Sequence, residues 1–420
     1  MQTKRVLFAT LGSLGDLYPY LALASEMQRR GHEATILTSS QHRSRIEQCG
    51  VRFQQTAPDL NFSDRAFQER TMNEVTGGRF MLRDVILPKI RESYDNLFAA
   101  ASGKDLLISH MLTYAGPLVA EKTGIPWVST VLAPLSFFSY RDSPVLVSRL
   151  SGMRETAPWL NAFINRIARS TTKSWNEPVY RLRHELGLAQ GGEPIYDAQH
   201  SPARVLAMFS PLLARAQADW PPQTQITGFP FWDEQAGGTE MCGELVEFLA
   251  AGPAPVVFTL GSSAVLNPGT FYKESVDAVG KLGVRAVILD GEGGSGTRIG
   301  RNILRLPSAP HSYVFQRASV IVHAGGIGTC ARAMRAGRPM LIVPFAYDQP
   351  DNASRLVRLG VARMIGRNSY TAARAVEEIG SLLANSSYRS QAEGSARVLE
   401  KEDGAGTACD ALERCLSGSC

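Results

Sequence analysis

The sequence predicts an α/β protein made of two doubly wound, Rossmann-like halves. With 420 residues the chain is too long for one ordinary domain and suits two, and its hydrophobic fraction of 44% can fill a core in each. Short apolar runs alternate with longer segments of helical period, which is the pattern of parallel strands covered by helices. Each half also opens with an apolar run that ends in Leu-Gly-Ser, at residues 11–13 and 260–262.

The first half begins with a βαβ pattern. Residues 6–10 and 34–38 predict strands, and the segment between them carries apolar residues at helical spacing, in a helix that we expect Pro19 to open. A helix is also expected at residues 115–122. Further apolar runs predict three more strands, of which the third would be the last of this half: residues 105–109, 127–131 and 204–209.

Proline and glycine concentrate between residues 220 and 238, so we place the junction of the two halves there. We expect an N-terminal domain over residues 1–235, which includes the linker, and a C-terminal domain over residues 236–420. Because ligands of such sheets bind beyond the carboxyl ends of the strands, we expect the active site in the cleft between the domains. The second half again alternates predicted strands (256–260, 286–289, 320–323, 340–343) with helices that include 270–282 and 329–336.

The charge pattern argues against a nucleic-acid-binding arm, because the net charge of +5 is spread without a run of like charges. A basic cleft for a small anion fits this charge equally well. The first apolar run stops at Gly12, too early for a secretory signal. Residues 127–140 are interrupted by Pro134 and are shorter than the roughly 20 residues needed to cross a bilayer. We expect a cytoplasmic protein without a transmembrane segment.

The cysteines and histidines show no metal-binding pattern. Neither a CxxC pair nor zinc-finger spacing occurs, which argues against a disulfide framework and a structural metal and fits a reducing compartment. The nearest carboxylate pair, Asp290 and Glu292, lies in a Gly-rich loop. We therefore expect no metal site. The six cysteines are Cys49, Cys242, Cys330, Cys409, Cys415 and Cys420.

A Gly-rich turn at residues 323–329 (HAGGIGT) follows one predicted strand and opens the next helix. Glycines let the backbone approach a ligand, and the free N–H groups of a helix start attract phosphate. The alternative is a turn that only allows tight packing. Asp348 and Gln349 occupy the next strand-to-helix turn, where they could bind sugar hydroxyls or cap the helix.

Together these peptides resemble the donor-binding region of family 1 glycosyltransferases of the GT-B fold. The resemblance rests on H-x-G-G-x-G-T at residues 323–329, A-G-x-P at 336–339 and P-x-x-x-D-Q-x-x-N-A at 344–353, and it covers nearly the whole chain. It is nearest to bacterial enzymes related to the rhamnosyltransferase of rhamnolipid synthesis, through GSLGD at residues 12–16, DWP at 219–221 and TGFP at 227–230.

The resemblance implies a set of donor-binding residues. His323 and Thr329 would bind the diphosphate, with Ser262 and Ser263 nearby, and Asp348 and Gln349 would hold the sugar. Where plant enzymes stack a Trp on the base, this chain has Ala309, Pro310 and His311, which favours dTDP over UDP. The full set is Ser262, Ser263, Ala309, Pro310, His311, His323, Gly325, Gly326, Gly328, Thr329, Asp348 and Gln349.

Asp16 is the expected catalytic residue. The turn that carries it lacks GxGxxG, which argues against a nicotinamide site. The resemblance matches Asp16 to the general base of the GSxGD branch, and an attacking hydroxyl needs such a group to take its proton. The alternative is a cap for the helix that we expect to begin at Pro19. Ser13 and His110 are acceptor-side candidates, with His110 either orienting the acceptor or pairing with Asp16.

The segment from Arg149 to Glu185 combines many arginines with a helical apolar face that includes Leu160, Phe163 and Ile167. We expect an ordinary helix packed on the sheet. The alternative is a lip that admits a lipid-like acceptor and touches an anionic membrane surface.

The resemblance implies an inverting, metal-independent transfer of a hexose, such as rhamnose or another deoxysugar, from a dTDP- or UDP-sugar. The nucleotide sugar is a co-substrate and no cofactor is expected. The acceptor would be a hydroxyl of an apolar molecule, such as a hydroxy fatty acid lipid or a natural-product aglycone. Two alternatives stay open: a catalytically silent relative that activates a partner enzyme, and a nucleotide-sugar epimerase of the same fold.

Overall fold

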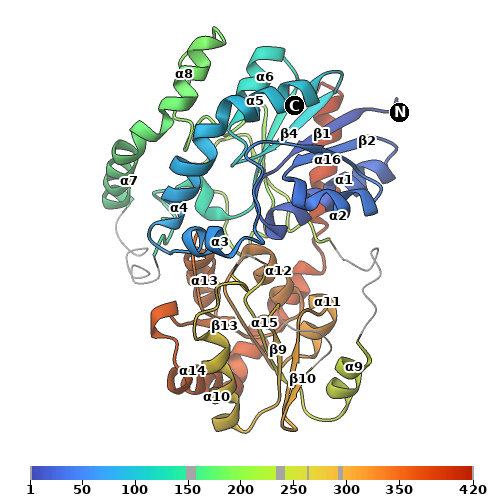
Figure 1. Cartoon of the computed structure of the whole chain (residues 1–420), viewed down its shortest axis with the longest axis vertical. Coiled ribbons are helices and arrows are strands. Elements are labelled where there is room, and N and C mark those ends of the chain that lie inside the picture. Colours follow the sequence, from blue (N-terminus) through green and yellow to red (C-terminus); the bar gives the residue numbers. More distant parts are fainter. Residues whose placement is uncertain (1, 148–157, 233–241, 263, 292–296, 419–420) are drawn as a thin grey trace.

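The computed structural model describes residues 2–147, 158–232, 242–262, 264–291 and 297–418. It contains two seven-stranded sheets, one in each half of the chain, and the N-terminal half lies above the C-terminal half in Figure 1. The predicted α/β architecture of two doubly wound halves is therefore confirmed. The expected domain boundary after residue 235 lies outside the described residues and stays a prediction.

The N-terminal sheet is parallel throughout, in the order β3-β2-β1-β4-β5-β6-β7. Its strands are short and mostly buried because helices cover both faces. They are β1 (Arg5–Ala9), β2 (Glu33–Thr38), β3 (Arg52–Gln55), β4 (Leu106–His110), β5 (Trp127–Val131), β6 (Arg204–Ala207) and β7 (Thr224–Ile226). The helices of this half are α1 (Leu14–Arg29), α2 (Arg43–Gln48), α3 (Arg65–Thr71), α4 (Gly77–Arg79), α5 (Ile90–Ala101), α6 (Ala115–Thr123), α7 (Pro158–Thr172) and α8 (Glu177–Glu185).

The C-terminal sheet has the order β10-β11-β9-β8-β12-β13-β14, and only the edge pair β10 and β11 is antiparallel. Its strands are β8 (Val256–Thr259), β9 (Ala286–Leu289), β10 (Thr297–Ile299), β11 (Ile303–Leu306), β12 (Val320–His323), β13 (Met340–Ile342) and β14 (Ala362–Met364). The helices are α9 (Gly243–Ala250), α10 (Phe271–Leu282), α11 (His311–Val314), α12 (Ile327–Arg335), α13 (Gln349–Arg358), α14 (Ala372–Ala384), α15 (Ser386–Leu399) and α16 (Gly404–Leu416).

Two local predictions in the first half are wrong. The strand near residues 204–209 is not the last of its sheet, because β7 forms the edge beyond it inside the Pro-rich stretch. Helix α1 does not open at Pro19: it begins at Leu14, with Ser13 as its N-cap, and Pro19 lies inside it. A proline this near the N-terminus removes one helical hydrogen bond, while the side-chain bonds of the cap satisfy the first turn.

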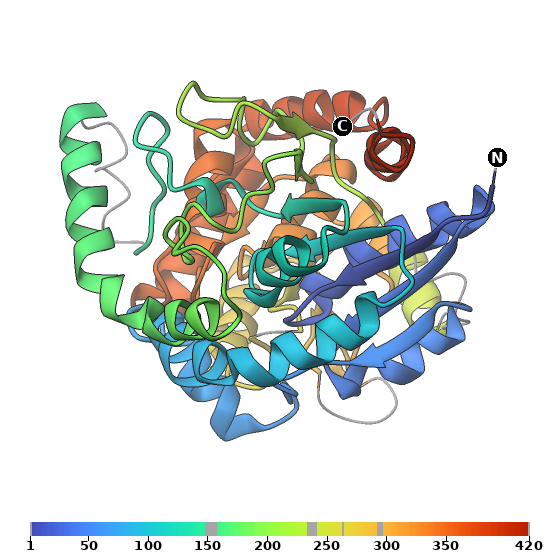
Figure 2. The same ribbon diagram turned by 90° about the horizontal axis from the view of Figure 1, so that it is seen from above.

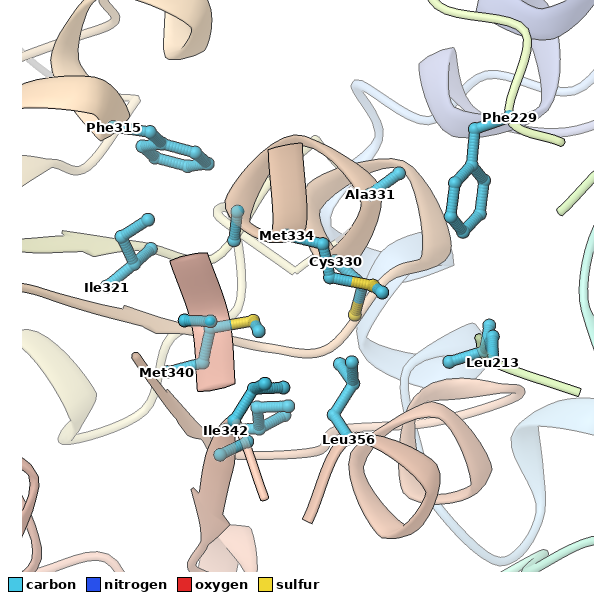
Figure 3. Packing of buried hydrophobic residues seen from close by; sticks show 14 of the residues in the cluster. Leu213, Phe229, Phe315, Ile321, Cys330, Ala331, Met334, Met340, Ile342 and Leu356 are labelled. Carbon is cyan, nitrogen blue, oxygen red and sulfur yellow. The ribbon is translucent and has the colours of Figure 1, made fainter. Parts of the chain in front are cut away.

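One hydrophobic cluster joins the two halves. Phe209, Leu213 and Phe229 come from the N-terminal half, and residues of α12 and α13, such as Met334 and Leu356, come from the C-terminal half. Figure 3 shows Leu213, Phe229, Met334 and Leu356 of this cluster around α12. Burial of apolar surface is the main favourable term in such contacts, so the cluster holds the halves together.

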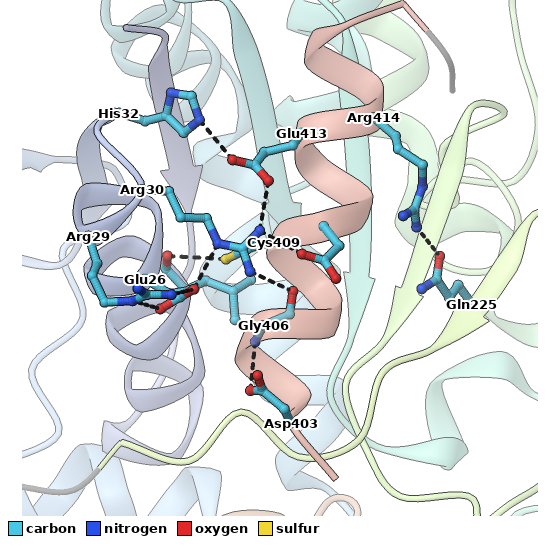
Figure 4. Close-up of polar contacts among 12 residues, drawn as sticks. Glu26, Arg29, Arg30, His32, Gln225, Asp403, Gly406, Cys409, Glu413 and Arg414 are labelled. Atoms are coloured by element: carbon cyan, nitrogen blue, oxygen red, sulfur yellow. Dashed lines mark hydrogen bonds and ion pairs between the residues drawn. The ribbon is translucent and has the colours of Figure 1, made fainter. Parts of the chain in front are cut away.

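Helix α16 crosses back to the N-terminal half and packs against α1, as Figures 1 and 4 show. Its Cys409 and Leu412 belong to the core cluster of the first sheet. Arg30 at the end of α1 binds Glu413 of α16 at 2.7 Å, and the same carboxylate lies 3.2 Å from His32. Residues 404–416 are therefore part of the N-terminal core, although they follow the second sheet in the chain.

The cysteines depart from expectation at one position. Cys49, Cys242, Cys330 and Cys409 are free thiols, but Cys415 is disulfide-bonded. Within the described part of the chain, no helix combines the length and the hydropathy that crossing a membrane requires.

Candidate functional site

The turn between β1 and α1 presents Asp16 in the first helical turn. The Asp16 carboxylate accepts hydrogen bonds from the Ser13 backbone N–H (2.8 Å) and the Ser13 hydroxyl (3.1 Å), and the Ser13 hydroxyl accepts from the Gly15 N–H. These contacts form a capping box. Asp16 can therefore both cap the helix and act as a base. Its Oδ2 stabilises the start of the helix, and its Oδ1 is left for another partner.

The environment of Asp16 suits a proton acceptor. Burial raises the pKa of Asp16 to about 6, although the hydrogen bonds from Ser13 oppose the shift. His110, at the end of β4, places Nε2 3.8 Å from Asp16 Oδ1. Burial lowers the pKa of His110 to about 3, so the ring is neutral, and its Nδ1 accepts from the Leu112 N–H. The remaining proton is therefore on Nε2, which faces Asp16.

A second histidine, His42, contacts the backbone of this turn. His42 is buried, and its Nε2 lies 3.0 Å from the carbonyl oxygen of Gly12. Gly12 has φ +143°, and a Cβ there would meet Asp16 Oδ2 at 2.2 Å. The turn thus needs glycine at this position. Sequence reasoning missed His42, and the only sequence signal for it is its place just after the second strand.

In the second half, His323 ends β12 directly before the Gly-rich turn. Its side chain is fully buried, and Nδ1 accepts from the Gly325 N–H at 3.0 Å. Burial lowers the pKa of His323 to about 3. The neutral ring therefore carries its proton on Nε2, and this atom is buried without a hydrogen-bond partner in the structure. A buried donor of this kind is costly unless a ligand satisfies it.

The glycines of this turn differ in whether a side chain would fit in their place. Gly325 has φ +91°, and a Cβ would lie 2.8 Å from Ile342 Cγ2, so this position requires glycine. A Cβ at Gly326, the N-cap of α12, would meet nothing within 4 Å. Gly328 lies in the first turn of α12 with Thr329 after it. The backbone at the start of α12 is therefore accessible, as a phosphate site needs.

The next strand-to-helix turn brings Asp348 to the start of α13. Asn352 Nδ2 donates to Asp348 Oδ2 at 2.7 Å and to the Gly325 carbonyl at 3.0 Å, which ties the two turns together. Burial raises the pKa of Asp348 to about 7, and the charge of Asp16 adds to the shift. Asp16 of the first half is therefore near enough to Asp348 of the second half to act on it electrostatically. Sequence reasoning assigned no role to Asn352, although its i, i+4 spacing from Asp348 was a usable signal.

Gln349 and Tyr347 shape this turn. Gln349 is buried, and its Oε1 accepts from the backbone N–H groups of Phe345 (2.8 Å) and Ala346 (3.1 Å). Its amide oxygen is therefore used within the protein. Tyr347 has φ +60°, a strained conformation for an aromatic residue, and its ring packs against core clusters of both halves.

The remaining predicted donor residues lie on loops around α12. The backbone at Gly261 approaches Thr329: a Cβ there would be 3.5 Å from Thr329 Oγ1. Ser262 is exposed, and its carbonyl accepts from Gln68 Nε2 of the first half at 3.3 Å. Ser263 lies outside the described residues.

His311 opens α11 after Ala309 and Pro310, and its ring stacks on Phe315 at 4.4 Å between centroids. Burial lowers the pKa of His311 to about 3, and the positive charge of Arg332 adds to the shift. Because Arg332 belongs to α12, this loop lies near the helix that follows the Gly-rich turn.

Two polar contacts that sequence reasoning missed connect the halves. The buried Arg355 of α13 binds Asp351 at 2.7 Å, and it also pairs with Asp142 of the first half. Arg367 donates to the Met72 carbonyl at 3.3 Å beside an interdomain cavity that none of the predicted site residues line. Among the described residues, no group of three or more His, Cys, Asp or Glu side chains could hold a metal ion.

Two protein-family models match this chain. The model of the glycosyltransferase family 28 N-terminal domain matches residues 6–136. The model of the erythromycin biosynthesis protein CIII-like C-terminal domain matches residues 273–406. The first match refines the family 1 resemblance drawn from the motifs.

The chain is 32% identical to O-mycaminosyltylonolide 6-deoxyallosyltransferase of Streptomyces fradiae in an alignment of 372 residues that covers 85% of this chain and 84% of the relative. It is 26% identical to sterol 3-beta-glucosyltransferase UGT80A2 of Arabidopsis thaliana over 97% of its own length, and it spans only 65% of that relative. The structure of glycosyltransferase VinC in complex with dTDP superposes with a TM-score of 0.67 at 22% identity, over 99% of this chain and 100% of VinC, which shows a shared fold.

Proposed function

We infer the function from the family, because this chain belongs to the glycosyltransferases of the GT-B fold that join a family 28 N-terminal domain to an erythromycin CIII-like C-terminal domain. We propose that it transfers a 6-deoxyhexose from a dTDP-sugar to a hydroxyl group of an apolar acceptor. The transfer would invert the anomeric carbon and proceed without a metal ion.

The observation that carries this proposal is the placement of Asp16. Asp16 belongs to the first half and Asp348 to the second, the charge of Asp16 raises the pKa of Asp348, and the pKa of Asp16 is itself raised to about 6. A base of this pKa is ionised at neutral pH and still accepts a proton in the transition state. His110 Nε2–H lies 3.8 Å from Asp16 Oδ1, which is beyond hydrogen-bonding distance, so it acts on the ionised oxygen only through its dipole.

In the proposed reaction, the acceptor oxygen attacks the anomeric carbon and gives its proton to Asp16 Oδ1. The bond from that carbon to the diphosphate breaks with its electron pair, so the leaving group gains negative charge. Three donors can stabilise it: the N–H groups at the start of α12, the Thr329 hydroxyl and the unpartnered Nε2–H of His323. These donors would stabilise the negative charge of the diphosphate, which a bound metal ion does in other transferases.

The donor assignment rests on the relatives. The Streptomyces fradiae enzyme is named for transfer of a 6-deoxyallosyl group, and VinC was solved with dTDP. A 6-deoxyhexose such as rhamnose fits both, and the loop of Ala309, Pro310 and His311 would receive the base. Asp348 would accept hydrogen bonds from the sugar hydroxyls. A natural-product aglycone or a sterol is the proposed acceptor class, in keeping with the names of the two relatives.

A nucleotide-release assay tests the proposal. Purified protein is mixed with dTDP-rhamnose, other dTDP-6-deoxyhexoses or UDP-glucose, together with macrolide aglycones, sterols, hydroxy fatty acid lipids or phenols, with and without EDTA. We expect acceptor-dependent release of dTDP that EDTA does not reduce. Release from UDP-glucose alone would contradict the donor assignment. Tight dTDP binding without release from any pair would favour a silent relative that activates a partner.

A further inference from the structure

Helix α7 exposes three large hydrophobic side chains that an ordinary surface helix would bury. Trp159, Phe163 and Ile167 are 73%, 58% and 49% exposed. They recur every four residues and so form one stripe within an arc of about 80°. These are three of the large hydrophobic side chains that the described surface exposes, and they stand on a single helix face. The prediction that this helix packs its apolar face on the sheet is therefore wrong for Phe163 and Ile167, whereas Leu160 and Ile164 at the edge of that face are half-buried.

The inner face of α7 is instead attached by polar side chains. Asn165 Nδ2 donates to the Phe138 carbonyl at 2.7 Å, and Asn161 Nδ2 donates to the Tyr140 carbonyl at 3.3 Å. Asparagine inside and tryptophan outside is the reverse of the usual pattern. The apolar stripe thus contributes nothing to the core, and the helix is held in position without it.

Charge on α7 has one sign. Residues 158–172 contain Arg166 and Arg169 and no acidic residue, and Lys173 follows directly. Arg169 is neutralised by Glu193 (2.9 Å) and Asp197 (2.6 Å). In the part of the chain that the structure describes, no carboxylate pairs with Arg166 or Lys173. Arg166 lies about 20° around the helix from Trp159, so an unpaired cation adjoins the apolar stripe.

We propose that α7 is a docking helix for an anionic lipid surface. Trp and Phe beside Arg and Lys are the residues that interfacial helices use to enter the headgroup region and bind anionic lipids. Figures 1 and 2 both place α7 at the outer edge of the N-terminal half, where none of the described elements covers it. The three side chains together expose on the order of 400 Å². That is about half of the roughly 800 Å² per partner in a stable protein interface.

The position of α7 would let membrane docking deliver an apolar acceptor to the protein. Its inner face rests on the segment of Phe138 and Tyr140, and this segment leads to Asp142, which pairs with Arg355 of α13. Because α13 begins directly after Asp348, these contacts link α7 to the predicted sugar site. An apolar acceptor could therefore enter from the bilayer. Only this consequence rests on the proposed function, since docking itself requires no sugar transfer.

Vesicle flotation of the full chain tests the proposal, with phosphatidylcholine vesicles and vesicles that also contain phosphatidylglycerol. We expect binding to the anionic vesicles that is at least about tenfold stronger and falls at high salt. The triple variant Trp159→Ser, Phe163→Ser, Ile167→Ser should lose at least about tenfold in partitioning. The double variant Arg166→Glu, Lys173→Glu should lose the preference for anionic vesicles.

The matched control is Phe98→Ser on α5, which removes another exposed aromatic side chain (44%) and should bind vesicles as the wild type does. Thermal unfolding and dTDP binding confirm that each variant is folded, whatever its activity. Absence of vesicle binding by the wild type, or equal binding by the triple variant, would overturn the proposal. So would a wild-type dimer in light scattering that the triple variant abolishes, because the stripe would then be a contact between two copies.

Discussion

Replacing Asp16 with Asn tests the proposed chemistry with little change in structure. The amide oxygen of Asn can keep the place of Asp16 Oδ2, which accepts from the Ser13 N–H at 2.8 Å and the Ser13 hydroxyl at 3.1 Å. The capping box therefore survives. The amide NH₂ takes the place of Oδ1, 3.8 Å from His110 Nε2, a separation at which no hydrogen bond is lost. Only the capacity to accept a proton disappears.

The expected effect on turnover follows from the role of a general base. Such a group contributes about 10²- to 10⁴-fold, so Asp16→Asn should lower kcat by that factor. Stability should not fall. The pKa of Asp16 is about 6 in the folded protein and near 3.8 when unfolded, so the wild type loses stability as pH rises through this interval. Asn avoids that cost, which after allowance for 31% exposure is on the order of 1–2 kcal/mol at pH 8.

The assay compares single-turnover sugar transfer, dTDP affinity by calorimetry and urea unfolding at pH 8 for wild type, Asp16→Asn and Ser13→Ala. The Ser13 variant is the matched control, because it loses the cap hydroxyl and about 1 kcal/mol of stability but keeps the carboxylate. We expect the Asn variant to bind dTDP normally, unfold no earlier than wild type and turn over at least about 100-fold more slowly. Turnover within about threefold of wild type would show that Asp16 is not the base.

The pH profile of kcat/KM should show an acidic limb with a pKa of about 6, because only the ionised form of Asp16 accepts a proton; a flat profile between about pH 5 and 8 would contradict this. His323→Ala should weaken dTDP binding by about tenfold or more in calorimetry, since it removes the buried, unpartnered Nε2–H, and unchanged affinity would move the phosphate site elsewhere. Arg355→Met should cost about 3–5 kcal/mol in urea unfolding, because it leaves Asp351 buried without its guanidinium partner. The double variant with Asp351→Asn should recover part of that loss, and full additivity of the two changes would argue against a buried pair.

Strongly buried strands could be predicted from the sequence almost to the residue. Apart from Ser129 and His323, residues 127–131, 286–289 and 320–323 are apolar or β-branched on both faces, because helices cover both sides of each sheet, and they are β5, β9 and β12. Edge strands could not be found this way. Strand β7 has three half-buried residues in a Pro-rich stretch, so neither length nor burial distinguishes it from a loop.

Patterns at strand ends also located the turns that face the cleft, where Asp16, His323 and Asp348 lie. The sequence could not show which atoms remain available. Gln349 uses its amide oxygen on the backbone, whereas His323 keeps a buried donor unpartnered, and both follow from tertiary packing. The side to which the apolar face of α7 points could not be predicted either, because an apolar stripe has the same period whether it faces the core or the solvent.

The return of α16 to the first sheet sets an order of events during synthesis. Leu412 and Cys409 complete the core around α1, about 400 residues after β1 leaves the ribosome. At about 5–20 residues per second, the first sheet waits on the order of 20–80 s for its last helix. During that interval the apolar face of α1 that α16 will cover is exposed. The core of the N-terminal half is thus completed only after the whole C-terminal sheet has been made, which leaves an interval in which chaperones can act on it.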